Sequence, residues 1–255
     1  MHNRRTFLTG AAAVGGITLL PYRASAAGHG TDAFASATGE VTVTPISHAS
    51  FVMQTPAGVI YVDPVGEASS YADQPAPDLI LVTHEHGDHY NAETLAALMA
   101  DTTVLITNRA VFAMLPEDLQ ARANAISNGE TASFETVEVE AIPAYNTTEG
   151  RTDFHPEGRD NGYVVNVDGL RVYISGDTED IPEMRALENI DVAFVCMNLP
   201  FTMDAAAAAS AVSEFAPTYV YPYHYRGRDN GTQDPMEFAN MLTSETEAKM
   251  GGWYA

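Results

Sequence analysis

Short hydrophobic segments separated by Gly and Pro run through most of the chain and predict alternating strands and helices. The segment Asp78–Thr83 is almost entirely apolar, which is typical of a buried strand. Val137–Ile142 alternates apolar and polar residues with a period of two, which also predicts a strand. Gly162–Val167 and Leu170–Ser175 flank Asp168-Gly169, a strong signal for a two-residue hairpin turn.

The remaining segments complete the order β-rich, α/β, β-rich, α/β. Further strands are expected at residues 41–43, 50–54, 59–62, 103–106, 191–196 and 217–222, and helices at residues 92–100, 109–115, 182–187, 204–215 and 235–242. This order predicts two similar halves, each a sheet covered by helices on its outer face. Residues 41–255 are expected to form one domain, and the Gly-, Ala-, Ser- and Thr-rich segment 27–40 is predicted to be a linker.

The first 26 residues have the features of an export signal rather than of a folded segment. Arg4 and Arg5 precede a weakly apolar stretch, and Ala24-Ser25-Ala26 is a small-x-small cleavage site. The start resembles a twin-arginine signal, so residues 1–26 are predicted to be removed and the mature protein to be periplasmic or secreted. A disordered tail or a short anchor is the alternative. No apolar run approaches the roughly 20 residues of a membrane span.

Charge and cysteine content exclude several classes of partner and site. With 34 acidic against 12 basic residues, the net charge is −22, which argues against nucleic acid or an anionic membrane as partner. A small-molecule substrate is therefore expected, and no feature specifies an oligomeric state. Cys196 is the single cysteine, so neither an intramolecular disulfide nor a Cys-rich metal site can form. Any metal must be bound by His and carboxylate side chains.

Three of the eight histidines lie within one six-residue segment, His84-Glu85-His86-Gly87-Asp88-His89. It follows a predicted strand and precedes a predicted helix. In an extended segment, His84 and His86 point the same way, which allows both imidazoles to bind one metal. Gly87 allows a turn that aims Asp88 and His89 elsewhere. Imidazole with carboxylate suits Zn, Fe or Mn, whereas the alternative is a polar loop that happens to be rich in His.

This segment resembles the signature of the metallo-β-lactamase-fold hydrolases, and the similarity extends over nearly all of residues 41–255. Val62-Asp63-Pro64 is similar to the first motif of that family, Ser175-Gly176-Asp177-Thr178 to the fourth and Pro222-Tyr223-His224 to the fifth. With Ser47-His48-Ala49-Ser50, these motifs look like the branch that contains ascorbate-phosphate lactonase and N-acyl phosphatidylethanolamine phospholipase D. The resemblance implies an α/β fold, specifically a four-layer αββα sandwich.

The resemblance also implies two divalent metal ions, with Zn preferred and Mn or Fe as alternatives. The ligands expected for the first ion are His84, His86 and His155. Those expected for the second are Asp88, His89 and His224, with Asp177 bridging the two ions. Such a metal pair activates water for attack on an ester, lactone, amide or phosphodiester bond. Asp88 or the metal-bound water would then protonate the leaving group, and Asp88 and Asp177 are the expected catalytic residues.

The third motif departs from the family pattern. A His is expected soon after Ala141-Ile142-Pro143-Ala144, but Tyr145 and Asn146 follow instead. The next histidine is His155, and we predict that it reaches into the site from the loop before Gly162. In the alternative, Asn146 or water takes its place and the first metal is weak or absent.

Other residues are expected outside the direct ligand set. Asp63 is predicted to accept a hydrogen bond from a ligand His, with capping of the Asp-Pro turn as the alternative. His48 is assigned equally to such an outer position and to an ordinary loop. Arg159, Arg226 and Arg228 flank predicted ligands and either bind a substrate anion or are simply solvated.

The sequence therefore predicts a metal-dependent hydrolase. A mononuclear-iron redox enzyme and a metal-binding protein without turnover are the alternatives. The number and identity of the bound metals distinguish these three functions.

Overall fold

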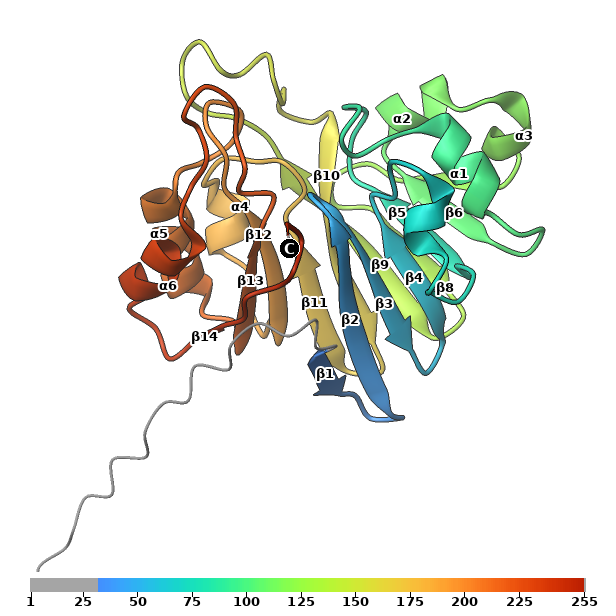
Figure 1. The fold of residues 1–255 in the computed structure, drawn as a ribbon, viewed down its shortest axis with the longest axis horizontal. Helices are drawn as coiled ribbons and strands as arrows, with labels where there is room; N and C mark the ends of the chain where they lie inside the picture. Colours follow the sequence, from blue (N-terminus) through green and yellow to red (C-terminus); the bar gives the residue numbers. More distant parts are fainter. Residues whose placement is uncertain (1–31, 255) are drawn as a thin grey trace, which may run out of the picture.

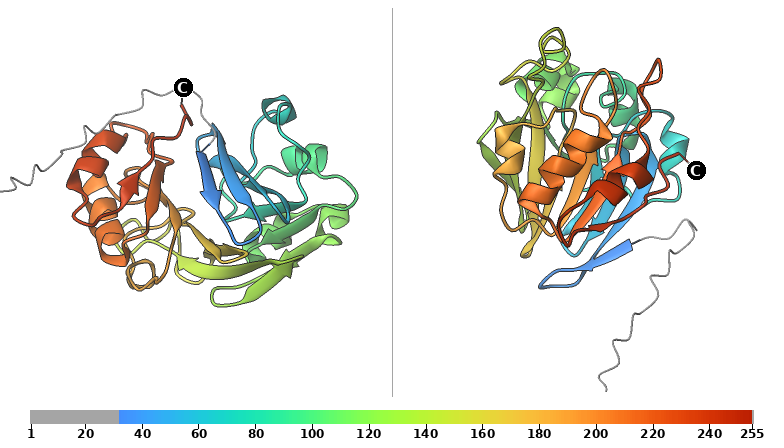
Figure 2. Two further views of the ribbon diagram at one scale, coloured as in Figure 1. Left: turned by 90° about the horizontal axis from the view of Figure 1, so that it is seen from below. Right: turned by 90° about the vertical axis from the view of Figure 1, so that its left-hand side faces the viewer.

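Two seven-stranded sheets face each other, and helices cover the outer side of each sheet (Figure 1). The structure is a computed structural model that describes residues 32–254. The view from below shows the same order of layers, with helices on both outer sides (Figure 2). This is the four-layer αββα sandwich that the sequence predicts. The signal peptide expected at residues 1–26 lies outside the described residues.

The first sheet and its helices are formed by residues 32–125. Its strands, in spatial order, are β1 (Asp32–Ala35), β2 (Glu40–Ser47), β3 (Ser50–Thr55), β4 (Gly58–Val62), β5 (Leu79–Val82), β6 (Val104–Thr107) and β7 (Ala123–Ala125). The strands are antiparallel from β1 to β4 and parallel from β4 to β7. The helices are a 3₁₀ turn (Ala68–Tyr71), α1 (Ala92–Leu98), α2 (Arg109–Met114) and α3 (Glu117–Gln120).

The second sheet repeats this plan. Its strands are β8 (Thr131–Phe134), β9 (Val137–Ala144), β10 (Asp160–Val167), β11 (Leu170–Ile174), β12 (Val192–Cys196), β13 (Tyr219–Tyr223) and β14 (Glu247–Ala248). The strands are antiparallel from β8 to β11 and parallel from β11 to β14. The helices are α4 (Pro182–Arg185), α5 (Ala205–Phe215) and α6 (Pro235–Met241).

The strand β1 lies within the segment 27–40 that the sequence predicts to be a linker. It pairs antiparallel with β2, and Phe34 contacts the rings of Tyr219 and Tyr221 on β13 of the other sheet. Phe34 is the single buried residue of β1, so no apolar run marks this strand in the sequence. The second half of the expected linker therefore belongs to the folded domain.

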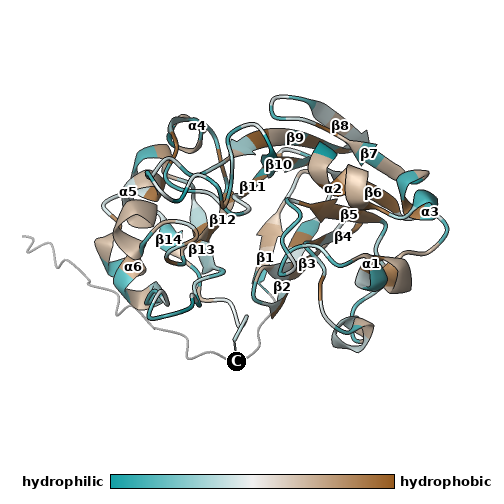
Figure 3. Ribbon diagram, turned by 90° about the horizontal axis from the view of Figure 1, so that it is seen from above, coloured by the Kyte–Doolittle hydropathy of each residue, from teal (hydrophilic) through white to brown (hydrophobic). Residues whose placement is uncertain are grey.

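One core cluster fills the space between the sheets and continues beneath the second sheet's helices, and a second cluster lies beneath the first sheet's helices. Strand β5 shows why its sequence is apolar throughout: Leu79 and Leu81 join the core between the sheets, whereas Ile80 and Val82 pack beneath the helices. Figure 3 shows β5 and its neighbours as the most hydrophobic segments of their half. Phe51 on β3 stacks on Phe194 on β12, with ring centroids 4.1 Å apart, and so joins the two sheets.

The loops at one end of the sandwich position the histidine-rich segment. The histidine-rich segment follows β5 of the first sheet. Three loops of the second sheet, those after β9, β11 and β13, lie at the same end of the sandwich. None of the helices formed by residues 32–254 has the length and apolar content needed to cross a bilayer.

Candidate metal centre

The loop between β5 and α1 folds into a tight turn that presents two imidazoles together. The backbone N–H groups of His89 and Tyr90 both donate to the carbonyl oxygen of His86, at 2.9 and 2.8 Å. His84 and His86, two residues apart at the start of this loop, face the same side, with His84 Nε2 3.1 Å from His86 Nδ1. The sequence predicts that the turn aims His89 elsewhere, but the ring centroids of His89 and His84 lie only 4.0 Å apart, and both residues belong to a set of potential ligands with Asp177.

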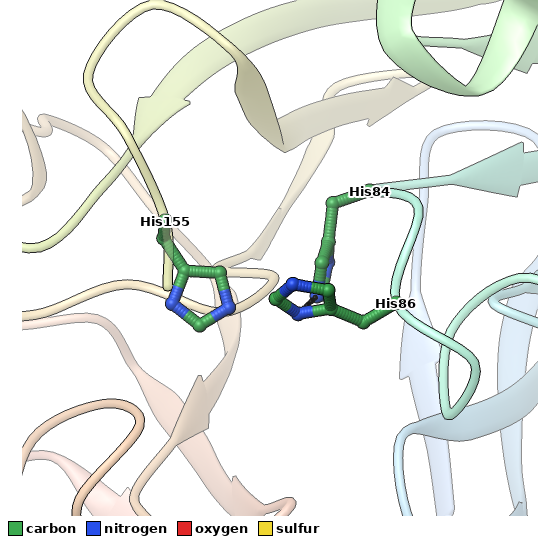
Figure 4. Close-up of side chains that lie close together, drawn as sticks. All are labelled: His84, His86 and His155. Carbon is green, nitrogen blue, oxygen red and sulfur yellow. Dashed lines mark hydrogen bonds between the residues drawn. The ribbon is translucent and has the colours of Figure 1, made fainter. Parts of the chain in front are cut away.

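His155 enters from the second half, on the loop between β9 and β10. Figure 4 shows its ring directed at those of His84 and His86. The three residues offer nitrogen atoms that all lie within 4.8 Å of one another. His84 and His155 are fully buried, which keeps their rings from sampling other positions. The structure thus brings together the three side chains that the sequence predicts for the first metal.

Asp177 lies between this group and a second one. Its Oδ2 is 3.5 Å from His155 Nε2, and its Oδ1 is 3.3 Å from His89 Nε2 and 3.8 Å from His224 Nε2. The second group is completed by Asp88, whose Oδ2 is 3.3 Å from His224 Nε2. The seven predicted ligands therefore lie close together, and the sets of potential ligands are His84 with His86 and His155, His84 with His89 and Asp177, and His48 with Asp88 and His224.

Asp177 follows Gly176 at the end of β11, where the backbone approaches a neighbouring strand closely. Gly176 has φ of +59°, and a Cβ there would lie 2.9 Å from the carbonyl oxygen of Asn161. Only glycine accommodates both this conformation and this contact. The Gly-Asp pair thus sets the direction of the Asp177 carboxylate.

Asp63 contacts His89 through Nδ1, whereas Nε2 of the same ring faces Asp177. Asp63 is fully buried, and His89 Nδ1 donates to its Oδ2 at 2.8 Å. The Thr83 backbone N–H and hydroxyl also donate to the carboxylate, each at 2.8 Å, which fixes its orientation. With Nδ1 donating to Asp63, Nε2 of His89 faces Asp177 and the second group. Asp63 therefore occupies the outer position predicted for it.

Asn146 holds His155 in the same way. Its amide nitrogen donates to the carbonyl oxygens of Arg151 and Phe201, at 3.0 and 2.8 Å. This pairing turns Asn146 Oδ1 toward His155 Nδ1, 3.3 Å away, so that Nδ1 donates and Nε2 faces the metal group. Asn146, which the sequence leaves as an alternative ligand, instead contacts the outer side of His155.

Replacing Asn146 with alanine is expected to weaken the first metal site by about 10- to 100-fold, because an outer partner of a ligand His typically contributes that much. A competition titration with a metal-binding dye measures the affinity. Asn124→Ala, at an exposed position on β7, is the matched control and is expected to leave affinity unchanged. An unchanged affinity in Asn146→Ala would show that His155 needs no such support.

His48 lies beside the second group rather than in an ordinary loop. Its Nε2 is 3.4 Å from Asp88 Oδ2, and its ring centroid is 3.9 Å from that of His224. Its Nδ1 is 2.6 Å from the hydroxyl oxygen of Tyr254, at the far end of the chain. His48, Asp88 and His224 also form a set of potential ligands. His48 thus contacts one side of Asp88 while His224 contacts the other.

The polar atoms facing the centre of this site fit a cation. Within residues 32–254, three buried atoms of the site have no hydrogen-bond partner: His89 Nε2, His155 Nε2 and Asp177 Oδ1. An unsatisfied buried polar group costs about 1–3 kcal/mol. These atoms come from three different loops and point at shared space, so divalent metal ions would satisfy them together. The nitrogen and oxygen donors suit Zn, Mn or Fe.

The electrostatics of the site favour ligands in their metal-binding protonation states. Burial lowers the pKa of His84 well below its usual value and that of His155 to about 4, which keeps both rings neutral. Burial acts to raise the pKa of Asp88, but hydrogen bonds from His224 and His48 outweigh it and hold the pKa well below the usual range. Burial likewise opposes ionisation of Asp177, but the neighbouring His224 and His89 keep its pKa low. Both carboxylates are therefore anionic.

His89 differs from the other buried histidines. Burial acts to lower its pKa, but the carboxylates of Asp177 and Asp63 outweigh burial and raise the pKa well above the usual value. Without a metal, His89 therefore carries a proton between two carboxylates. A divalent cation would supply the positive charge instead and release that proton.

Several contributors to the site were not singled out from the sequence. Thr83 contacts Asp63 and His84, Asn198 lies 2.5 Å from His224 Nδ1, and Tyr254 contacts His48. The position of Thr83, directly before the first ligand, was a usable signal. Arg159, considered as an anion-binding residue, instead forms ion pairs with Asp160 and Glu85 at 2.7 and 2.9 Å.

This fold and this cluster of His and Asp side chains define a metal-dependent hydrolase of the metallo-β-lactamase superfamily. Residues 42–224 match the family described as Beta-lactamase superfamily domain. A UPF0173 metal-dependent hydrolase from Anaeromyxobacter dehalogenans is 32% identical over 84% of this chain and 85% of its own length. The chain therefore belongs to the UPF0173 metal-dependent hydrolase family.

Solved structures agree with this assignment. A candidate metal-dependent hydrolase from Parabacteroides distasonis is 40% identical, with a TM-score of 0.78 over 87% of this chain and 98% of its own. Igni18, a metallo hydrolase from Ignicoccus hospitalis, is 22% identical with a TM-score of 0.67, over 82% of this chain and 94% of its own. The second similarity concerns the fold alone.

Proposed function

We propose that this enzyme uses two divalent metal ions, Zn in preference to Mn or Fe, to hydrolyse an ester, lactone, amide or phosphodiester bond in a small molecule. One observation carries the proposal: Asp177 lies between two groups of ligands, and its buried Oδ1 has no hydrogen-bond partner within residues 32–254. A single metal site gives no reason for one carboxylate to face three imidazoles from both groups. Membership of a metal-dependent hydrolase family supports the same reading.

The side chains of the site would have three different roles in hydrolysis: metal binding, proton transfer and orientation of the ligands. His84, His86 and His155 would hold one ion, Asp88, His89 and His224 the other, and Asp177 both. When bound, such ions lower the pKa of water and polarise the bond to be cleaved. Asp88 is the ligand most open to solvent, with its side chain 49% exposed, so its anionic Oδ2 would accept a proton from the attacking water and pass that proton to the leaving group. Asp63 and Asn146 keep the ligand rings oriented.

The test is the metal content of the chain lacking residues 1–26, followed by assays on a panel of esters, lactones, amides and phosphodiesters. About two Zn or Mn ions per chain and turnover of a panel member are expected. A single iron with oxygen consumption would instead favour the redox alternative. Two bound ions without turnover across the whole panel would favour a metal-binding role.

Export is a separate part of this proposal. It is supported by Arg4 and Arg5 and by the small-x-small site Ala24-Ser25-Ala26. Replacing both arginines with lysine is expected to leave the precursor uncleaved in the cytoplasm of a host with a twin-arginine system. Fractionation and intact mass measure this outcome. Mature protein lacking residues 1–26 in the periplasm despite both substitutions would contradict the twin-arginine route.

A further inference from the structure

A cavity of about 450 Å³ opens beside the second ligand group. It is lined by His48, Gly87, Asp88, Asn198, Phe201, Arg226, Gly227 and Arg228. Asp88 and His48 connect this cavity to the proposed reaction centre, and its volume suits a small ligand. The side chains that line the cavity would therefore contact the part of a substrate that lies next to the bond to be cleaved.

The lining of this cavity holds two arginines, Arg226 and Arg228, against a single carboxylate, that of Asp88. Among residues 32–254, neither Arg226 nor Arg228 forms an ion pair, although acidic residues outnumber basic ones by 34 to 12 in the whole chain. Of the six other arginines among residues 32–254, four form ion pairs (Arg109, Arg151, Arg159 and Arg185), whereas Arg122 and Arg171 do not. Arg226 and Arg228 differ from Arg122 and Arg171 because both residues line one cavity beside the second ligand group, which favours a binding role.

Arg226 is held in place by the end of the chain. Its guanidinium carbon lies 4.3 Å from the ring centroid of Tyr254, and its Nη2 donates to the Tyr254 carbonyl oxygen at 3.3 Å. Tyr254 is itself fixed through its hydroxyl to His48 and by the adjacent Trp253, which is buried among aromatic rings. An arginine restrained in this way loses less side-chain entropy when it binds an anion.

The backbone that carries both arginines is also restrained. A Cβ at Gly227 would lie 2.6 Å from the Leu199 carbonyl oxygen, and Gly231 packs against the same group. The Leu199 N–H donates to the Gly231 carbonyl oxygen at 3.0 Å. These contacts hold the arginine-bearing loop against the segment that provides Asn198 and Phe201, so the cavity is formed before a ligand binds.

We propose that this cavity selects substrates that carry an anionic group, a carboxylate or a phosphate, near the bond to be cleaved. Arg226 and Arg228 would bind that group, while the bond itself lies against Asp88 and the metal-binding side chains. The geometry favours an anion because a planar guanidinium group offers paired N–H donors to carboxylate and phosphate oxygens. This inference rests on the proposed hydrolytic function and specifies its substrate class.

The kinetic test compares matched esters on the metal-loaded protein. The first is a 4-nitrophenyl ester with a free carboxylate at the end of its acyl chain, the second is the same ester with that carboxylate methylated, and the third carries a phosphonate there. We expect kcat/KM to be about 10- to 100-fold higher for an anionic ester than for the neutral one, because hydrogen bonds to charged groups are strong. The better of the two anionic esters identifies carboxylate or phosphate as the preferred group.

Removing the two charges should abolish this preference. In the Arg226→Gln/Arg228→Gln double variant, the ratio of kcat/KM between anionic and neutral esters is expected to fall toward one, mainly through KM. Arg109→Gln, an exposed arginine outside the cavity, is the matched control and should keep the ratio of the parent protein. A parent that shows no preference, or a double variant that keeps it, would overturn the inference.

A binding measurement separates this inference from the proposed function. If no ester is hydrolysed, the proposed ester-hydrolysing activity fails, and calorimetric titration of the metal-loaded protein with glutarate and with inorganic phosphate decides the inference. Affinity at least about tenfold weaker in the double variant than in both the parent and Arg109→Gln supports an anion site at the two arginines. Equal affinity in all three proteins, or no detectable binding, overturns it.

Discussion

Replacing Asp177 with asparagine is expected to lower the affinity of both metal sites by more than about 100-fold, because loss of an outer partner alone costs about 10- to 100-fold. The Asp177 carboxylate lies near both His89 and His155. Its Oδ1 is 3.3 Å from His89 Nε2, and its Oδ2 is 3.5 Å from His155 Nε2. Asparagine preserves the volume of the side chain but removes the charge that offsets two cations. Elemental analysis after dialysis measures the metal remaining, and hydrolytic activity is expected to be lost with it.

Asp118→Asn is the matched control for this variant. Asp118 is exposed on α3, so the same change of charge there should leave metal content as in the parent. Full metal content in Asp177→Asn would mean that Asp177 does not bridge two ions.

Replacing His155 with alanine is expected to remove one ion and leave the other. The remaining ligands of the second group come from the loops after β5, β11 and β13, so they do not depend on the loop that carries His155. Hydrolysis should fall by at least about 100-fold, because a metal acting as a Lewis acid contributes several kcal/mol to the transition state. Metal content and kcat/KM are measured on the same preparation.

His48→Ala is the informative comparison for this second prediction. His48 belongs to the set of potential ligands with Asp88 and His224, so its loss should leave the ion at His84 and His86 bound and weaken only the other ion. Metal content in His155→Ala equal to that of the parent would show that Asn146 or water completes the first site, the alternative that the sequence leaves open.

Local sequence patterns were sufficient where a segment carries its own signal. The apolar run at residues 78–83 predicted β5, and Asp168-Gly169 predicted the turn between β10 and β11. The elements missed between residues 116 and 136, namely α3, β7 and β8, have only three or four residues each, too few to show a period. The strand β1 was missed because a single apolar side chain, Phe34, anchors it.

In the candidate site, too, some residues could be predicted from local sequence patterns and others could not. His84 to His89 stand together in the sequence, and Asp177 and His224 lie at the ends of predictable strands. The supporting contacts cannot be read locally, since His48 and Tyr254 lie 206 positions apart and Asn198 and His224 lie 26 apart. His48 and Tyr254 are brought together across the two halves, whereas Asn198 and His224 meet because the strands they follow, β12 and β13, are neighbours in the second sheet.

The origin of the ligands in both halves has a consequence for folding. Four of the seven, His84, His86, Asp88 and His89, follow β5 of the first sheet, whereas His155, Asp177 and His224 follow strands of the second. Ions bound between them would act as cross-links that close only when the halves have docked, so metal binding and sheet docking would be one cooperative event. The metal would then stabilise the native assembly of the halves as well as supply the chemistry.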